Sequence, residues 1–230
     1  MPVSPPVLSP ATLDFLRQLR DNNRRDWFTA NRVHYETARA EWEEFVGGLI
    51  TQIGQFDDIT GLTAKDCLFR IHRDVRFSKD KSPYKVNFAA AVGPGGRQSK
   101  HLDYYLHLEP GASFLGGGVY EPTGEQRAKI RQEIDYNAAE IKAIVHAPAF
   151  ARFFGEVQGT KLKTTPKGYD RQHPDIELLR LQQFFFTHPY SDTAVQSPDF
   201  LAKVVEGCRI LKPLLDFFNY ILFEEKPTEK

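Results

Sequence analysis

The chain has 230 residues, 41% of them hydrophobic and 26% charged, and its 30 basic and 30 acidic side chains give a formal net charge of zero. This composition is typical of a folded globular protein and excludes an intrinsically disordered chain. The charge balance excludes a protein whose whole surface follows nucleic acid, although it is compatible with a local basic patch.

The first quarter of the chain is predicted to be helical. Residues 1–9 are rich in proline and are expected to form a flexible lead-in. Ser9 and Pro10 then give the signal of a helix start, because proline fits the first helical position. Apolar residues at helical spacing predict one helix over about 10–21 and a second helical region over about 24–53.

The middle of the chain changes to a period of two, which predicts β-strands. The expected strands cover about 68–77, 86–92, 102–109 and 113–120. Residues 78–85 and the Gly-rich 93–96 separate strands as loops. Because no helical pattern lies between these strands, they are expected to form an antiparallel meander.

Helical patterns return after residue 122. The predicted helices cover about 122–146, 148–155, 174–181 and 197–223, and "FFFTHPY" at 184–190 is expected to be a short buried strand. Helices, then strands, then helices predict an α+β fold with a central, mostly antiparallel sheet packed by N-terminal and C-terminal helices. The length favours a single domain over 10–223, followed by a charged tail at 224–230.

The cysteines and the hydropathy of the chain indicate the cellular compartment of the protein. Cys67 and Cys208 lack the spacing of a metal or disulfide motif, which favours two buried thiols in a reducing cytosol. The Pro-rich start has no secretory pattern, and no apolar run approaches the length of a membrane span. We therefore expect a soluble, cytoplasmic protein.

The segment "FRIHRDVRFSKDKSPYK", residues 69–85 and hereafter the basic ribbon, has six Lys or Arg and two Asp residues. Its first part alternates, so that Arg70, His72, Asp74 and Arg76 share one strand face. Arg73 falls on the apolar face and is expected to meet a carboxylate or the sheet edge.

Clustered guanidinium and ammonium groups favour a phosphate or carboxylate ligand. The predicted anion-binding residues are Arg70, Arg73, Arg76, Lys79, Lys81, Lys85 and, from a later segment, Lys167. The alternative is a solvated sheet face with internal Arg–Asp pairs.

Candidate acid–base groups lie in the ribbon and in the strand that ends near residue 109. Asp74 and Asp80 are expected to orient the cations or to move protons. His107 is a candidate general acid or base, with a plain hydrogen-bonded histidine as the alternative. We expect Asp103 and Glu109 to offset the guanidinium charges. The predicted supporting residues are Tyr84, Tyr105 and Glu109. No cofactor is predicted, and a divalent metal at His107 and Glu109 is the less favoured option.

Small residues and a turn are candidates for shaping this site. Ala89, Ala90 and Ala91 leave room above the sheet for a ligand or for a packed helix, and the glycines at 116–118 predict a bulge or a close backbone approach. The turn "PKGYD" at 166–170 either closes over the site as a lid or is simply exposed.

The basic ribbon resembles the hallmark segment of a widespread uncharacterised family, mainly bacterial with fungal members, that is filed as a domain of unknown function. The resemblance extends over most of the chain and includes "LRDNNRRDWFTANRVHY", "YYLHLEPGASFLGGGVY" and "PKGYDRQHPDIELLR". It implies a single intracellular domain. It supplies no activity, cofactor or catalytic residue.

Two functions follow from the ribbon. The favoured one is anion binding, in an enzyme that acts on a phosphorylated or otherwise anionic small molecule, with the ribbon cations neutralising charge in the transition state. The alternative is a binding module for nucleic acid or an acidic partner, in which Tyr84, Tyr104 and Tyr105 stack on bases. An anionic small molecule is favoured over nucleic acid as the partner, and no membrane is expected. Whether the protein is an enzyme stays open.

Overall fold

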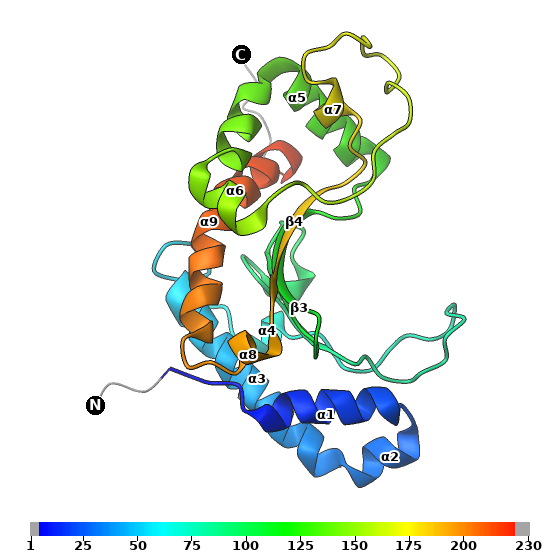
Figure 1. Ribbon diagram of the computed structural model, residues 1–230, viewed down its shortest axis with the longest axis vertical. Helices are drawn as coiled ribbons and strands as arrows, with labels where there is room; N and C mark the ends of the chain where they lie inside the picture. The colour runs from blue at the N-terminus through cyan, green and yellow to red at the C-terminus, as the bar shows by residue number, and fades with distance from the viewer. Residues whose placement is uncertain (1–4, 224–230) are drawn as a thin grey trace. The chain divides into compact units, whose positions relative to one another are not determined.

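The computed structural model describes residues 5–223 and contains α-helices and a four-stranded sheet (Figure 1). The strands, in their order across the sheet, are β1 (Phe88–Val92), β2 (Tyr104–Leu108), β3 (Ser113–Val119) and β4 (Phe184–Tyr190). This order follows the chain, so β1 to β3 form the expected meander. β1 and β2 are antiparallel, with Phe88 opposite Leu108 and Val92 opposite Tyr104.

The chain divides into two compact units that interleave along the sequence. Unit 1 contains the residues up to 99, together with 104–115 and 189–208. Unit 2 contains 100–103, 116–188 and the residues from 209 onwards. Both β3 and β4, and the last helix, therefore contribute residues to both units.

Unit 1 holds the N-terminal helices and β1 and β2. Its helices are α1 (Pro10–Asp21), α2 (Arg25–Ala30), α3 (Arg32–Ile53), α4 (Ala64–Cys67), the 3-10 helix η1 (Gly96–Gln98), α8 (Asp192–Val195) and the first part of α9 (Phe200–Phe223). α1 packs against α3, and Leu13, Leu16 and Leu19 of α1 are fully buried. The Trp42 ring stacks on Phe45 at 5.9 Å and on Phe88 at 6.4 Å, so aromatic contacts join α3 to β1.

Unit 2 is mainly helical. Its helices are α5 (Gly124–Val145), α6 (Pro148–Phe154), α7 (Ile176–Leu179) and the later part of α9. α5 begins with a capping box, in which Thr123 Oγ1 accepts from Gln126 N at 3.2 Å and Gln126 Oε1 accepts from Thr123 N at 2.9 Å. Gly118 has a φ of +107°, and a Cβ there would meet the backbone of Phe184 and Phe185. This glycine therefore confirms the expected close backbone approach.

The α+β class and the antiparallel sheet are confirmed. The helical region expected over 24–53 is two helices, because Asn31 leaves helical geometry with a φ of −105° and a ψ of 20°. The expected strand at 68–77 is wrong, since no regular strand covers it. Residues 1–4 of the lead-in and the tail at 224–230 lie outside the described residues. The single domain over 10–223 stays a prediction.

Two expectations about the interior and about membranes can be compared with the structure. Cys67 and Cys208 are both completely buried, as expected of core thiols. Between residues 5 and 223, no helix combines the length and the apolar character that crossing a bilayer requires. The cytoplasmic location stays a prediction.

Candidate functional site

The basic ribbon is a loop that folds back on itself between α4 and β1, and it is the long excursion beside the sheet in Figure 1. Its two arms meet at an isolated bridge between His72 and Tyr84. Arg73 N donates to Pro83 O at 2.9 Å, and Lys85 N donates to Ile71 O at 2.7 Å. Proline has no N–H to continue the ladder, which explains why this pairing stays short and why no regular strand forms.

In the first part of the ribbon, buried and exposed side chains alternate, as the period of two in the sequence predicts. Ile71 is buried, whereas Arg70 and His72 on either side are exposed. Phe77 breaks the pattern, because its side chain is 96% exposed. The period of two therefore described an extended arm correctly, although that arm does not belong to the sheet.

The tip of the ribbon is held by its own acidic residues. Arg73 forms an ion pair with Asp80, as expected of a cation on the inner face, and Asp80 also accepts from Ser82 N at 2.9 Å and Ser82 Oγ at 2.6 Å. These bonds, the Ser82 hydroxyl first, hold the pKa of Asp80 far below its usual range. Hydrogen bonds from Arg76 similarly lower the pKa of Asp74. Both carboxylates therefore stay ionised and orient cations, and neither is suited to donate a proton.

A cavity of about 390 Å³ lies between the ribbon and the end of α1. Its lining residues are Arg20, Asn23, Arg73, Asp80, Ser82, Tyr84, Lys85, Val86 and Asn87. Asn23 fixes this geometry, because its Nδ2 donates to Tyr84 O at 3.0 Å and its Oδ1 accepts from Tyr84 N at 3.1 Å. The cavity therefore combines ribbon residues with Arg20 and Asn23, which precede the ribbon by some fifty residues in the chain.

Lys85 is the cation in this cavity whose charge is least compensated. Its ammonium lies 5.4 Å from the centre of the Phe69 ring, and none of the ion pairs within residues 5–223 involves it. Burial, and then the charge of Arg70, lower the pKa of Lys85. Three cationic side chains and one carboxylate line the cavity, and that carboxylate already binds Arg73 and Ser82.

A second polar cluster lies on the β1–β2 face of unit 1 and centres on His107, whose side chain is 12% exposed. His107 Nε2 lies 2.8 Å from Glu109 Oε2. Because a carboxylate only accepts, Nε2 is the donor in this bond. The ring stacks on Phe114 at 4.8 Å, and His107 lies opposite Ala89 in the ladder, so that their side chains share one face. The small side chain of Ala89 thus leaves room for the imidazole.

Two further side chains complete the His107 cluster. Tyr105 Oη lies 3.4 Å from His107 Nδ1, and burial followed by the charge of Glu109 raises the pKa of the Tyr105 phenol. Asn87 Nδ2 lies 3.1 Å from both imidazole nitrogens. Since Glu109 is directed at the imidazole, the expectation that it offsets the ribbon guanidiniums is wrong. Asn87 lines the cavity and also contacts His107, so it joins the two clusters.

The remaining predicted residues are spread over the molecule. Lys81 Nζ donates to Val75 O at 2.9 Å, and Lys79 is exposed on the ribbon. Lys167 belongs to unit 2, whereas the ribbon belongs to unit 1. Sequence reasoning missed Arg20, Asn23 and Asn87, whose only signal is a polar side chain next to an element boundary. Over the described residues, no group of three or more His, Cys, Asp or Glu side chains is arranged to hold a metal ion.

The tyrosines proposed to stack on bases are differently placed. Tyr84 is buried and stacks on Phe28 at 4.0 Å between ring centres. Tyr104 is also buried, and its hydroxyl donates to Asp57 at 2.7 Å. Neither ring is available to a nucleic acid, so this part of the expectation is wrong.

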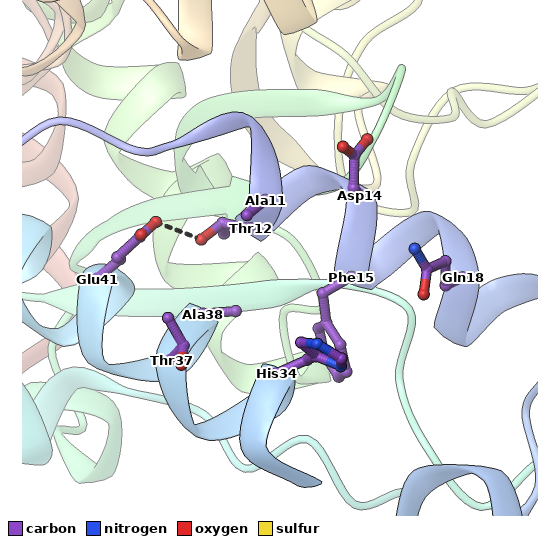
Figure 2. Close-up of a pocket in the computed structure, with 9 residues that line it drawn as sticks. All are labelled: Ala11, Thr12, Asp14, Phe15, Gln18, His34, Thr37, Ala38 and Glu41. Carbon is purple, nitrogen blue, oxygen red and sulfur yellow. Dashed lines mark hydrogen bonds between the residues drawn. The ribbon is translucent and has the colours of Figure 1, made fainter. Parts of the chain in front are cut away.

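Figure 2 shows a different hollow of about 270 Å³, between α1 and α3 of unit 1. The carboxylate of Glu41 points to Thr12 and accepts from Thr12 Oγ1 at 2.6 Å, from Ser9 Oγ at 2.8 Å and from Ser9 N at 3.1 Å. Both of its oxygens are therefore used to hold the start of α1. Apolar walls from Ala11, Phe15 and Ala38 make this hollow a packing groove.

Comparisons with known proteins place the chain in a family. Neither the curated proteins nor the solved structures gave a match. A family model described as "Conserved hypothetical protein (DUF2461)" matches residues 11–217, which is most of the chain and includes the basic ribbon. The resemblance to an uncharacterised family seen in the sequence is thereby confirmed. The chain belongs to the DUF2461 family of conserved hypothetical proteins.

Proposed function

We propose that the protein binds a small anionic ligand, through a phosphate or carboxylate group, in the cavity between the basic ribbon and the end of α1. One observation carries this proposal. The cavity is lined by Arg20, Arg73 and Lys85, and its only carboxylate, Asp80, is already bound by Arg73 and Ser82. An anion in the cavity supplies the charge that Lys85 lacks.

The partial burial of Lys85 strengthens this argument. A buried ammonium without a counter-charge is held at a cost, which its lowered pKa reports. A ligand oxyanion beside Lys85 restores the charged form, so ligand binding and protonation of Lys85 favour each other. Arg73, held in place by Asp80, adds a second cation whose orientation is fixed before the ligand arrives.

The neighbouring His107 cluster extends the proposal to catalysis on a phosphorylated small molecule. Glu109 Oε2 lies 2.8 Å from His107 Nε2 and so orients the imidazole, a side chain that can act as a general base. Asn87 contacts the imidazole and also lines the cavity. For His107 to act on a ligand in the cavity, the Asn87 side chain has to move aside.

Thermal-shift and calorimetric titrations test the binding proposal. The probes are orthophosphate, pyrophosphate, sugar phosphates, nucleotides and small carboxylates, at constant ionic strength. At least one of them is expected to stabilise the protein, and Lys85→Ala is expected to weaken its binding about tenfold or more. Lys79→Ala is the matched control, because Lys79 lies on the same ribbon and does not line the cavity. Equal binding by the wild type and Lys85→Ala would contradict the proposal.

A second candidate function, nucleic-acid binding by the ribbon, is favoured by Phe77. This exposed ring lies at the tip of the ribbon, 5.8 Å from the Arg76 guanidinium. An exposed aromatic ring beside cations is typical of surfaces that stack on single-stranded bases. In this case Phe77→Ala weakens oligonucleotide binding, and the affinity falls steeply with salt. An affinity that is insensitive to salt would rule this function out.

A further inference from the structure

We propose that unit 2 carries a second anion site, built on Arg127 and Arg131 of α5, which binds a tetrahedral oxyanion such as a phosphoryl group. This site is independent of the cavity beside the basic ribbon. It uses none of the same residues, and it is carried by different observations.

The two arginines lie on one face of α5, because residues four apart are neighbours on a helix. Both are half-buried. Their hydrogen-bond partners are backbone carbonyls: Arg127 Nη2 donates to Pro122 O at 3.1 Å, Arg131 Nε donates to Leu179 O at 2.8 Å, and Arg131 Nη2 donates to Leu181 O at 3.3 Å. These bonds orient the guanidinium groups and leave their charges uncompensated.

The counter-charge for this pair is missing. In the part of the chain that the structure describes, neither Arg127 nor Arg131 forms an ion pair with a carboxylate. Asp135, one turn further along α5, lies 3.2 Å from His173 Nε2 and is directed to that side chain. Arg127 Nε is buried and has no hydrogen-bond partner. Buried donors are normally satisfied, so this nitrogen is a donor in need of an acceptor.

The electrostatics of the pair agree with this account. Burial, and then the charge of Arg127, lower the pKa of Arg131, so Arg131 is half-buried beside a second positive charge. The Tyr169 ring reaches the same region from the turn at 166–170, and its phenol interacts electrostatically with Arg131 and Asp135. Burial and the charge of Asp135 raise the pKa of Tyr169, so it stays an O–H donor.

The chemistry of this site defines its ligand. Two guanidinium groups in carbonyl-fixed orientations offer several N–H donors to an oxyanion, and Arg binds such groups with two parallel bonds. A phosphoryl group matches both the charge and the number of acceptors. The same oxyanion can come from inorganic phosphate or from a phosphate ester. The turn at 166–170, for which a lid over the ribbon site and a simple exposed turn were the alternatives, contributes Tyr169 to the surroundings of this second site.

Calorimetric titration of the full chain with pyrophosphate, and with a simple phosphate ester in parallel, tests the proposal. The wild type is expected to show two classes of site. Arg127→Gln removes one of them and Lys85→Ala removes the other. Arg131→Lys keeps the positive charge but cannot form two parallel hydrogen bonds to one oxyanion. It is expected to weaken the affinity of the α5 site for the anion about fivefold or more. Lys129→Gln is the matched control, because Lys129 is on α5 and pairs with Glu125.

The outcomes separate the two sites. If Arg127→Gln and Arg131→Lys both bind with wild-type stoichiometry and affinity, the α5 site does not exist. If Lys85→Ala leaves the titration unchanged while Arg127→Gln loses a site, the α5 proposal stands and the ribbon proposal fails. The melting temperature of each variant shows whether it is folded, and Arg127→Lys replaces Arg127→Gln if the latter is not. If the α5 site binds pyrophosphate and not the phosphate ester, its ligand is a free anion. If it binds both compounds, it recognises the phosphoryl group that they share.

Discussion

The side-chain amide nitrogen of Asn87 lies 3.1 Å from both ring nitrogens of His107. His107 Nε2 donates to Glu109, and the equal distances place the Asn87 amide against the imidazole as a whole and not on one ring nitrogen. Asn87 Oδ1 is buried and has no hydrogen-bond partner. Because Asn87 also lines the cavity beside the basic ribbon, a ligand that moves its side chain changes what His107 contacts. This amide therefore connects the cavity with the His107 cluster.

The first prediction concerns the His107 tautomer. Nitrogen-15 NMR of the wild type is expected to show His107 with a proton on Nε2, because Glu109 accepts a hydrogen bond from that nitrogen. Glu109→Ala removes the acceptor, so the tautomers are expected to mix. Glu109→Gln restores the Nε2–H form, since its amide oxygen can accept. The exposed Glu121→Ala is the control. A wild-type spectrum dominated by the Nδ1–H form would contradict the account of this cluster.

The second prediction separates stability from binding at Lys85. Its pKa is lowered in the folded protein, so the folded state binds the proton less tightly than the unfolded chain does. Charged Lys85 therefore opposes folding at neutral pH, and this effect disappears as the pH rises through the lowered pKa toward 10.5. Lys85→Met is expected to keep or raise the melting temperature at pH 7 while it weakens anion binding about tenfold.

The control for that prediction is Lys79→Met, at an exposed position of the same ribbon. It is expected to change neither the melting temperature nor the affinity. A clear loss of stability in Lys85→Met at pH 7 would show that Lys85 has a structural role, and the assignment of its charge to a ligand would then be withdrawn.

The third prediction concerns the start of α1. Glu41→Ala leaves the buried Thr12 hydroxyl and the Ser9 amide without the carboxylate that accepts from them. We expect a loss of about 2–3 kcal/mol in the free energy of unfolding, measured by urea denaturation. Glu36→Ala, which removes only an exposed pair with Arg32, is expected to change the midpoint little. Equal effects of both substitutions would mean that the Glu41 bonds contribute no more than a surface pair.

The fourth prediction concerns Gly118. A Cβ at this position would meet the Phe184 carbonyl oxygen and lie 3.0 Å from Phe185 Cα, and the φ of +107° is strained for any other residue. Gly118→Ala is therefore expected to lower stability by about 3 kcal/mol or more, or to prevent folding. Gly124→Ala is the control, because its Cβ would meet nothing within 4 Å at the start of α5. That change is expected to be neutral or to stabilise the protein by about 0.5–1 kcal/mol.

The sequence was sufficient where a local pattern decides the structure. The helix expected over 10–21 and the strand expected over 102–109 are present as α1 and β2, with Leu13, Leu16 and Leu19 buried in the first and Tyr104, Leu106 and Leu108 buried in the second. The basic ribbon shows where such reasoning ends. Its period of two predicts an extended arm, but whether an extended arm joins a sheet depends on a partner that is distant in the sequence.

The same limit applies to the candidate site. The charge density of the ribbon located one wall of the cavity. Arg20 and Asn23 form another wall, and no pattern in the chain connects them with residues near 85. The hydrogen-bond partner of Glu109, which is His107, was also not predicted from the sequence. Carboxylate and imidazole lie two residues apart on one strand face, where they are close enough to bond, so a local contact prevailed over the long-range one that we expected.

The interleaving of the two units has a consequence for how the protein is made. Unit 1 includes residues 189–208, and unit 2 includes residues on both sides of that stretch. Many proteins of several units finish the first one while the ribosome is still adding the next. Here unit 1 cannot be completed before residue 208 has been added, and by then residues 100–103 and 116–188 of unit 2 have already been synthesised. The order of the units along the chain therefore rules out a simple sequence in which unit 1 is completed before the synthesis of unit 2 begins.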